Sequence, residues 1–299
     1  MTKSANCITI ILSKKESGLH LAGKHISYSE WKNWHICPHY HKLTYIDKVA
    51  QFEGNIYTAF GKAIHTVCEY TLTSPEKYRD AGSIEELVKE QFIAELNALP
   101  DDAQLEAKRD FALKEWLLNG VQIIPDLYRC LADKFGKLGE DWEVLAAEEQ
   151  LYEPITEFTE AEKKFKGFID LVVYSKKDEK IHLIDWKTCS WGWRREKKSD
   201  KILAYQLVFY KHFYAQKYEV DPKDVDCHFV LLKRTAKTGK KAEFVRVTAA
   251  KKRTTDALNA LTKALHNINK QNYIKNRTAC TNCKDRFGTC EFYQTEYCS

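Results

Sequence analysis

Five segments of the chain predict β-strands, because hydrophobic and polar residues alternate along parts of them and short hydrophobic runs make up the rest. These segments are residues 142–154, 165–175, 180–190, 225–235 and 242–249. A short polar run, SKKDEK, joins the second and third segments, so we expect these two strands to form an antiparallel hairpin.

Elsewhere hydrophobic residues recur every three to four positions, which predicts helices. The helical segments are residues 27–47 with an interruption at Cys37-Pro38, 58–73, 83–137, 204–218 and 254–272. A Pro inside a helical pattern ends or kinks the helix. Together these patterns predict an α/β fold, with helices wrapped around a central mixed sheet.

With 299 residues, of which 44% are hydrophobic, the chain can bury a sizeable core. We expect residues 1–25 to be a leader with one strand over residues 7–13. Residues 26–299 are expected to form a single domain. Its parts are a helical region over 83–140, a sheet core over 141–250, and a closing helix with a cysteine-rich tail over 251–299.

The strand over residues 180–190 stops alternating after Ile184, where Asp185 and Lys187 occupy one face with Trp186 between them. If Tyr174 pairs with Ile181 in the hairpin, Asp170 lies opposite Asp185. Lys187 then lies one step further along the same face.

Two carboxylates on opposed positions of neighbouring strands repel one another, unless a cation lies between them. Hard oxygen ligands suit Mg²⁺ or Mn²⁺. A bound metal polarises a phosphoryl oxygen and lowers the pKa of its water, while Lys187 steadies negative charge on the phosphate. The pattern thus indicates half of a metal-dependent site that cleaves phosphodiesters; the alternative is an inert, solvent-exposed pair.

Charge is unevenly distributed along the chain. Residues 1–150 contain 17 Lys and Arg against 23 Asp and Glu, whereas residues 151–299 contain 30 against 19. A basic face attracts a polyanion such as DNA, although a scattered, solvated lysine surface has the same count. No stretch approaches the roughly 18 apolar residues of a membrane helix, so we expect no membrane association and a cytoplasmic location.

Five short segments follow one another in the order GKAIH (61–65), AAEEQL (146–151), GFID (167–170), DWKT (185–188) and QLVFY (206–210). This order resembles that of PD-(D/E)XK nucleases of the RecB type. The resemblance implies a restriction-endonuclease-like fold and a role for each matched residue. Asp170 and Asp185 would be metal-binding carboxylates, Lys187 the catalytic lysine, and His65 and the main-chain carbonyl of Trp186 further metal ligands.

The same resemblance places Gln206 and Tyr210 near the active site and the DNA. It matches Glu148 to the strand glutamate of the catalytic set, with Glu149 as the near competitor. Each of these residues also has a purely structural interpretation. His65 can be a structural histidine on an amphipathic helix, and Gln206 and Tyr210 can be neighbours on an ordinary helix face.

Cys280, Cys283 and Cys290 lie within eleven residues near the C-terminus. A C-x₂-C pair by itself suggests zinc or an iron–sulfur cluster. With Cys37 just before a proline, the set resembles the iron–sulfur CRISPR-adaptation exonucleases and the AddB nuclease domain. That resemblance implies a [4Fe–4S] cluster joining the N- and C-terminal segments, with Zn²⁺ as the alternative. Cys298 competes for a ligand role but lies outside the family spacing.

The resemblance implies a divalent-metal-dependent DNA nuclease, an exonuclease with little sequence specificity acting on DNA that is single-stranded or has free ends. The rivals are a non-catalytic DNA-binding scaffold of the same fold and an RNA-directed nuclease. Enzymes of this kind work with partners in recombination, repair, CRISPR adaptation or phage DNA metabolism. Cleavage polarity, strand preference, oligomeric state and pathway are left open by the sequence.

Overall fold

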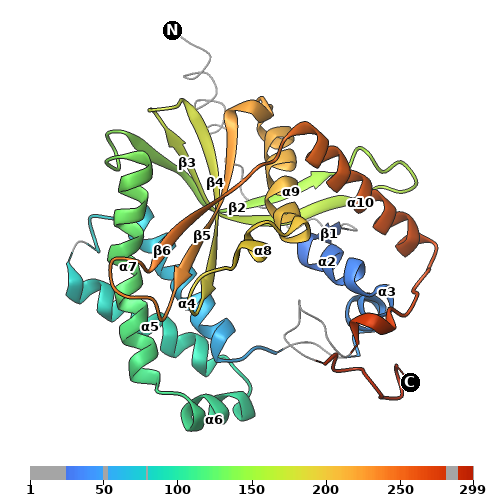
Figure 1. The fold of residues 1–299 in the computed structure, drawn as a ribbon, viewed down its shortest axis with the longest axis horizontal. Coiled ribbons are helices and arrows are strands. Elements are labelled where there is room, and N and C mark those ends of the chain that lie inside the picture. The colour runs from blue at the N-terminus through green and yellow to red at the C-terminus, as the bar shows by residue number, and fades with distance from the viewer. Residues whose placement is uncertain (1–24, 50–52, 79, 281–288, 299) are drawn as a thin grey trace. The chain divides into compact units, whose positions relative to one another are not determined.

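The computed structural model describes residues 25–49, 53–78, 80–280 and 289–298 (Figure 1). Most of the expected leader, including the strand predicted over residues 7–13, lies outside the described residues. The chain divides into two compact units: of the described residues, unit 1 holds 53–151 and 168–249, and unit 2 holds 25–49, 152–167 and 250–298. The assignment of residues 26–299 to a single domain stays a prediction.

Unit 1 contains four helices before the sheet strands, and two more among them. The helices are α4 (Ile56–Thr73), α5 (Ala81–Asn97), α6 (Asp101–Asp110), α7 (Leu113–Phe135), α8 (Arg195–Lys198) and α9 (Lys201–Tyr218), with a 3₁₀ turn, η2, at Pro222–Asp224. The strands are β2 (Trp142–Pro154), β3 (Lys164–Ser175), β4 (Lys180–Cys189), β5 (Val225–Lys233) and β6 (Ala242–Val247), of which β2 ends and β3 begins in unit 2.

The sheet is mixed, as predicted. In unit 1 its strands follow the order β3-β4-β5-β6, with β2 also pairing with β3. The first residues of β3, which lie in unit 2, pair in parallel with the short strand β1 (His25–Ser27). Strands β3 and β4 are antiparallel, β4 and β5 parallel, and β5 and β6 antiparallel. The predicted hairpin register is confirmed, because Tyr174 pairs with Ile181 and the last pair of the ladder joins Leu171 to Ile184.

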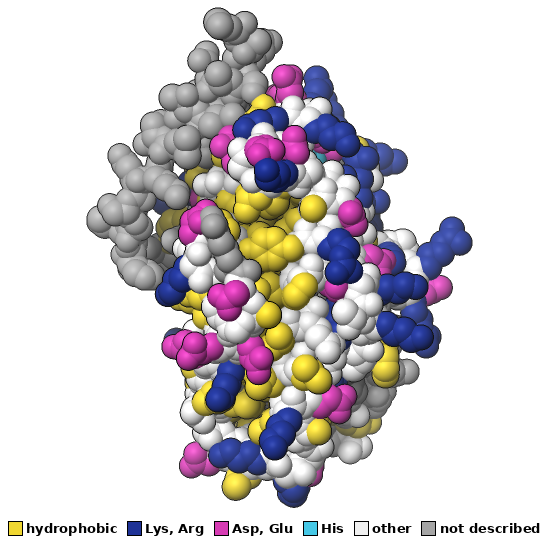
Figure 2. Space-filling view, turned by 90° about the vertical axis from the view of Figure 1, so that its left-hand side faces the viewer, with side chains coloured by type: hydrophobic (Ala, Val, Ile, Leu, Met, Phe, Trp, Pro, Cys, Tyr) yellow, Lys and Arg dark blue, Asp and Glu magenta, His cyan; other side chains and the backbone are white. Residues whose placement is uncertain are grey.

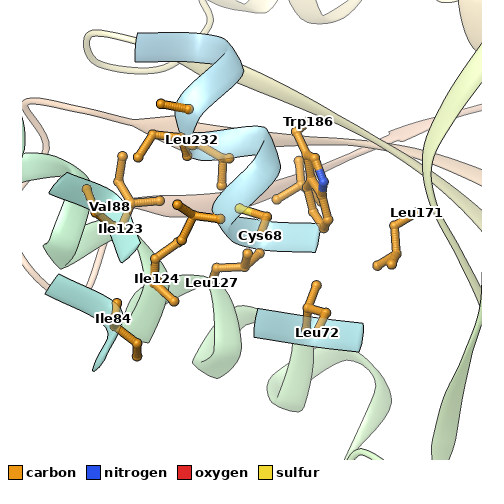
Figure 3. Packing of buried hydrophobic residues seen from close by; sticks show 14 of the residues in the cluster. Cys68, Leu72, Ile84, Val88, Ile123, Ile124, Leu127, Leu171, Trp186 and Leu232 are labelled. Atoms are coloured by element: carbon orange, nitrogen blue, oxygen red, sulfur yellow. The ribbon is translucent and has the colours of Figure 1, made fainter. Parts of the chain in front are cut away.

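Helices cover both faces of this sheet (Figure 1). Side chains of α4, α5 and α7 form one hydrophobic core with Leu171, Trp186 and Val230 of the strands (Figure 3). Helix α9 packs on β4 and β5, where the thiol of Cys227 donates a hydrogen bond to the Leu207 carbonyl at 3.6 Å. Because side chains alternate along a strand, Asp185 faces away from the core that holds Trp186.

Polar capping residues define where the helices begin and end more precisely than the spacing of hydrophobic residues does. Asn55 accepts hydrogen bonds from the backbone of Tyr57 and Thr58, so α4 begins two residues before the predicted start. The helical pattern over residues 83–137 is divided into α5, α6 and α7. Pro100 disfavours helical geometry at the residue before it, which explains the first break.

Unit 2 contains the segments that precede and follow the sheet core. They are β1 (His25–Ser27), α2 (Tyr28–Ile36), α3 (Pro38–His41), a π-helical turn (Lys42–Ile46), α10 (Lys251–Asn269) and a 3₁₀ turn (Arg277–Ala279). The predicted interruption is confirmed, since Cys37 is extended between α2 and α3. Helix α10 packs on α2, where the Trp31 indole donates to the Ala260 carbonyl at 3.2 Å.

On the face drawn in Figure 2, hydrophobic side chains gather along the middle and Lys and Arg side chains mostly along one side. The large hydrophobic residues exposed on α5, α6 and α7 are Ile93, Leu105 and Leu118. Among the described residues, no helix combines the length and the apolar character needed to cross a membrane.

Replacing Ile123 with Ala should remove about 2–5 kcal/mol from the free energy of unfolding, because Ile123 of α7 is fully buried in the core. Ile93→Ala is the matched control: the same atoms leave a helix position that is 46% exposed, so its effect should stay within about 0.5 kcal/mol. Urea unfolding measures both. Equal losses in the two variants would contradict the packing described.

Candidate active site

The two acidic residues of the hairpin lie where its ladder ends. One oxygen of Asp170 accepts a hydrogen bond from the backbone N–H of Trp186 at 2.6 Å, which fixes its carboxylate against β4. Asp185 is 2% exposed, and the charge of Asp170 raises its pKa. The structure therefore brings the two predicted carboxylates together on one side of the sheet.

Burial makes ionisation of this pair costly. It raises the pKa of Asp170 to about 7 and that of Asp185 to about 6, against an opposing effect of the Lys187 ammonium. Burial disfavours the charged form of a carboxyl group, and a second carboxylate nearby adds to the effect. Without a further cation, both groups are thus not fully ionised together near neutral pH.

Lys187 lies on the same face of β4 as Asp185. Its Nζ is 2.6 Å from Oδ2 of Asp185, a close ion pair. The same ammonium lies 5.6 Å from the ring centre of Phe229 on β5. Trp186, between the two charged residues, points into the core on the opposite face (Figure 3).

His65 reaches the carboxylates from α4. Its Nδ1 is 3.6 Å from Oδ2 of Asp170, slightly beyond a hydrogen bond. Burial, helped by the Lys187 charge, lowers the pKa of His65 to about 4, so the imidazole is neutral and keeps a lone pair for a metal. Gly61 explains the close approach of α4: a Cβ there would lie 3.1 Å from the Thr188 hydroxyl of β4.

Helix α9 supplies Gln206 and Tyr210, one turn apart. Nε2 of Gln206 donates to Oδ1 of Asp185 at 2.7 Å and also to the Tyr210 hydroxyl at 3.2 Å. Asp185 is thus held at one oxygen by an amide and at the other by Lys187. Burial raises the pKa of Tyr210, so its phenol stays protonated at neutral pH.

The backbone distinguishes Glu148 from Glu149. Glu149 is buried and is engaged by the Lys217 ammonium and the Tyr218 hydroxyl, both at 2.6 Å. Glu148 has a left-handed φ of 48°, unusual for a strand residue. Burial raises its pKa, as do the charges of Glu69 and Asp185, so its carboxylate is the one near the site.

Glu69 is a further acidic residue near the site that the sequence interpretation missed. It follows His65 by four positions in α4 and therefore shares its helix face. Its charge raises the pKa of both Glu148 and Asp170. The four-residue spacing after His65 was the signal in the sequence that could have identified Glu69. Residues one helical turn apart lie on the same face of a helix and therefore approach the same strands.

A second group of potential metal ligands lies at the other end of β4. Single ligand atoms of Asp178, His182 and Asp226 all lie within 4.8 Å of one another. Asp226 is already paired with Lys180 at 3.4 Å and Arg246 at 3.3 Å. These existing ion pairs account for the group without a metal.

In unit 2, three of the four predicted cluster cysteines line one pocket. Cys37 and Cys280 are buried, Cys290 is partly exposed, and Cys298 lines the same pocket. Cys283 lies outside the described residues. The cluster itself stays a prediction.

The raised pKa of Asp185 predicts a pH-dependent stability difference. The folded protein binds the proton of Asp185 more tightly than the unfolded chain does. This tighter binding contributes to the free energy of unfolding fully below pH 4, and the contribution is lost as the pH rises through about 6. Asp185→Asn cannot ionise, so without metal its stability relative to the unsubstituted protein should be about 1–2 kcal/mol higher at pH 8 than at pH 5.

Urea unfolding in EDTA at the two pH values measures that difference, with Asp101→Asn on the exposed first turn of α6 as the control. The control should show no comparable change. If the Asp185→Asn difference were the same at both pH values, the buried carboxyl would not have the raised pKa.

Comparison with known proteins identifies the family of the chain. The family model of the PD-(D/E)XK nuclease superfamily matches residues 25–290. No curated protein matches significantly. A solved structure from Eubacterium rectale, described as a "putative exonuclease", superposes with a TM-score of 0.53 over 93% of this chain and 97% of that one, at 13% identity. At that identity the likeness shows the fold alone. The chain belongs to the PD-(D/E)XK nuclease superfamily.

Proposed function

We propose that this protein is a Mg²⁺- or Mn²⁺-dependent deoxyribonuclease of the RecB type, which removes nucleotides from DNA ends with little sequence specificity. The single observation that carries the proposal is the buried pair Asp170 and Asp185 with Lys187 at 2.6 Å from one of them. A carboxylate pair with a neighbouring ammonium, in a chain of this superfamily, is what metal-dependent phosphodiester hydrolysis requires.

The donor set fits a hard divalent cation. His65, Asp170, Asp185 and the main-chain carbonyl of Trp186 would hold it, and Glu148 completes the acidic set. The raised pKa values of the two aspartates support this assignment, because a cation relieves the repulsion that the protein leaves uncompensated. When bound, such a metal acts as a Lewis acid and lowers the pKa of its water.

Side chains of the protein itself orient the Asp185 carboxylate and balance the charge of the site. Gln206 fixes the Asp185 carboxylate through its amide, and Tyr210 in turn accepts from that amide. Lys187 is placed to stabilise the negative charge that develops on a phosphate, since its ammonium is partly exposed at 28%. Tyr210 stays a neutral hydrogen-bonding group at neutral pH.

Substrate binding is assigned to the basic surface that follows β4. Helix α8 carries Arg195 and Lys197 in a single turn, and Lys197 lies over the Trp193 ring at 5.0 Å. Trp191 is 75% exposed and offers a face on which an unpaired base can stack. Such contacts read backbone charge and base faces, so binding should be salt-sensitive and tolerant of sequence.

The thiolate centre proposed for unit 2 is a [4Fe–4S] cluster held by Cys37, Cys280, Cys283 and Cys290, with Zn²⁺ as the alternative metal. The support is that Cys37 lines the same pocket as Cys280 and Cys290, although more than 240 residues separate it from them in sequence. Ligation there would link the α2–α3 junction to the tail. Its role would be structural.

Asp185→Asn and Lys187→Ala should each lower DNA cleavage by about 10²–10³-fold, while DNA binding is retained. Asp101→Asn and Lys176→Ala are the matched controls, since both residues are exposed, Asp101 on α6 and Lys176 in the turn between β3 and β4. Cleavage of end-labelled DNA and binding by fluorescence anisotropy give the two readouts. Unchanged cleavage in Asp185→Asn or Lys187→Ala contradicts the proposed site, and no cleavage by the unsubstituted protein with Mn²⁺ favours a non-catalytic DNA-binding scaffold.

An exonuclease needs ends. With Mn²⁺, linear DNA should lose mononucleotides or short oligonucleotides progressively from a labelled terminus, whereas covalently closed circular DNA of the same sequence should stay intact. EDTA should stop the reaction. Degradation of the circular substrate at a comparable rate would identify an endonuclease. Faster cleavage of RNA of the same sequence would show that the substrate is RNA and not DNA.

A further inference from the structure

The thiol pocket of unit 2 contains a cysteine that the family spacing does not include. Among the described residues, four cysteines line it: Cys37 between α2 and α3, Cys280 after the 3₁₀ turn, and Cys290 and Cys298 in the tail. The other cysteines described, such as Cys189 of β4, belong to unit 1. Four thiols from three separate stretches of chain therefore converge on one place.

Several contacts fix the position of Cys298. The Tyr297 carbonyl lies 2.9 Å from Nε2 of His39, which is in α3 directly after Cys37-Pro38. The Phe292 ring packs against Tyr40 of α3 at 5.6 Å and against Tyr297 at 6.1 Å between ring centres. The residues before Cys298 are thus attached to the same short helix that Cys37 precedes.

The four thiols line the same small pocket. The buried Cys280 thiol donates a hydrogen bond to the Asn276 carbonyl at 3.6 Å, and Cys37, Cys290 and Cys298 lie around the same space. Thiolates gathered in so small a space repel one another, and a metal ion that they ligate would remove that repulsion.

The backbone around the pocket suits thiolate ligands. The N–H of Asn276 points at Sγ of Cys37 at 3.4 Å, and the Asn276 amide side chain donates to the Ile36 carbonyl at 2.7 Å. A backbone N–H directed at sulfur stabilises a negative thiolate and orients a ligand. Asn276 therefore holds the segment before Cys280 against the Cys37 turn.

We propose that Cys298 is a ligand of the thiolate metal centre, together with Cys37, Cys280 and Cys290. Four soft sulfur donors suit either a tetrahedral Zn²⁺ or an iron–sulfur cluster. The inference revises the ligand set given above for this centre: the family spacing assigns the fourth position to Cys283, whereas the pocket brings Cys298 together with the other three cysteines. It does not depend on nuclease activity.

Metal content tests the proposal. The full chain is purified anaerobically as the unsubstituted protein, Cys298→Ser, Cys283→Ser and the control Cys189→Ser, and iron and zinc per chain are measured by mass spectrometry. Cys298→Ser should hold less than half the metal of the unsubstituted protein, while Cys189→Ser holds the full amount. Full metal in Cys298→Ser, with loss in Cys283→Ser, overturns the proposal.

Alkylation separates ligation from a general loss of structure. In the metal-loaded unsubstituted protein, iodoacetamide should modify Cys298 at least tenfold more slowly than after the metal is removed, with Cys37, Cys280 and Cys290 changing in parallel. Cys189 should react at the same rate in both states. If Cys298 reacts equally before and after metal removal, it is not a ligand. Neither readout involves DNA cleavage, so a failure here is distinct from failure of the nuclease proposal.

Discussion

The repulsion between two carboxyl groups buried side by side, Asp170 and Asp185, is the constraint on which the rest of the site depends. The protein surrounds them with Lys187, Gln206 and the Trp186 N–H, yet their pKa values stay raised. A fold that keeps such a pair in its interior retains an unfavourable interaction, which a bound cation would turn into a favourable one. In these terms the unfavourable interaction in the metal-free site would be the source of the metal affinity that we propose.

The sheet produces this arrangement through simple alternation. In β4 the odd positions carry Asp185 and Lys187 and the even position carries Trp186, which packs in the core with α4, α5 and α7. The antiparallel ladder between β3 and β4 ends at Leu171 and Ile184, and the next residue of each strand, Asp170 and Asp185, carries one of the two carboxylates. A glycine at position 61 then allows α4 to bring His65 close to the same strands.

Local sequence patterns were sufficient to predict the strands β2 to β6 and the hairpin register, and the order of five motifs resembled the superfamily to which the chain belongs. Period-two alternation fixes a register because a slip of one residue would turn Asp185 into the core and Trp186 out of it. The same logic could not separate Glu148 from Glu149, since the left-handed φ of Glu148 breaks the alternation. The choice depends on Lys217 and Tyr218, which lie nearly seventy residues further along.

Other features depend on contacts that no local pattern encodes. The division of the region after Ser83 into three helices follows from Pro100 and from packing, whereas hydrophobic period alone suggests one continuous helical stretch. The nearness of Glu69 to the carboxylates, and of Cys298 to Cys37, emerges only when distant segments meet. The spacing of cysteines along the chain says which thiols are close in sequence, and tertiary contacts decide which share a pocket.

Calorimetric titration with Mn²⁺ at pH 6.5, in two buffers of different ionisation enthalpy, tests the central claim most directly. If a cation displaces protons from the Asp170–Asp185 pair, the unsubstituted protein will bind Mn²⁺ with net proton release, and the double variant Asp170→Asn/Asp185→Asn will lose that binding. Binding of equal strength in the double variant, or binding without proton release, would contradict the account.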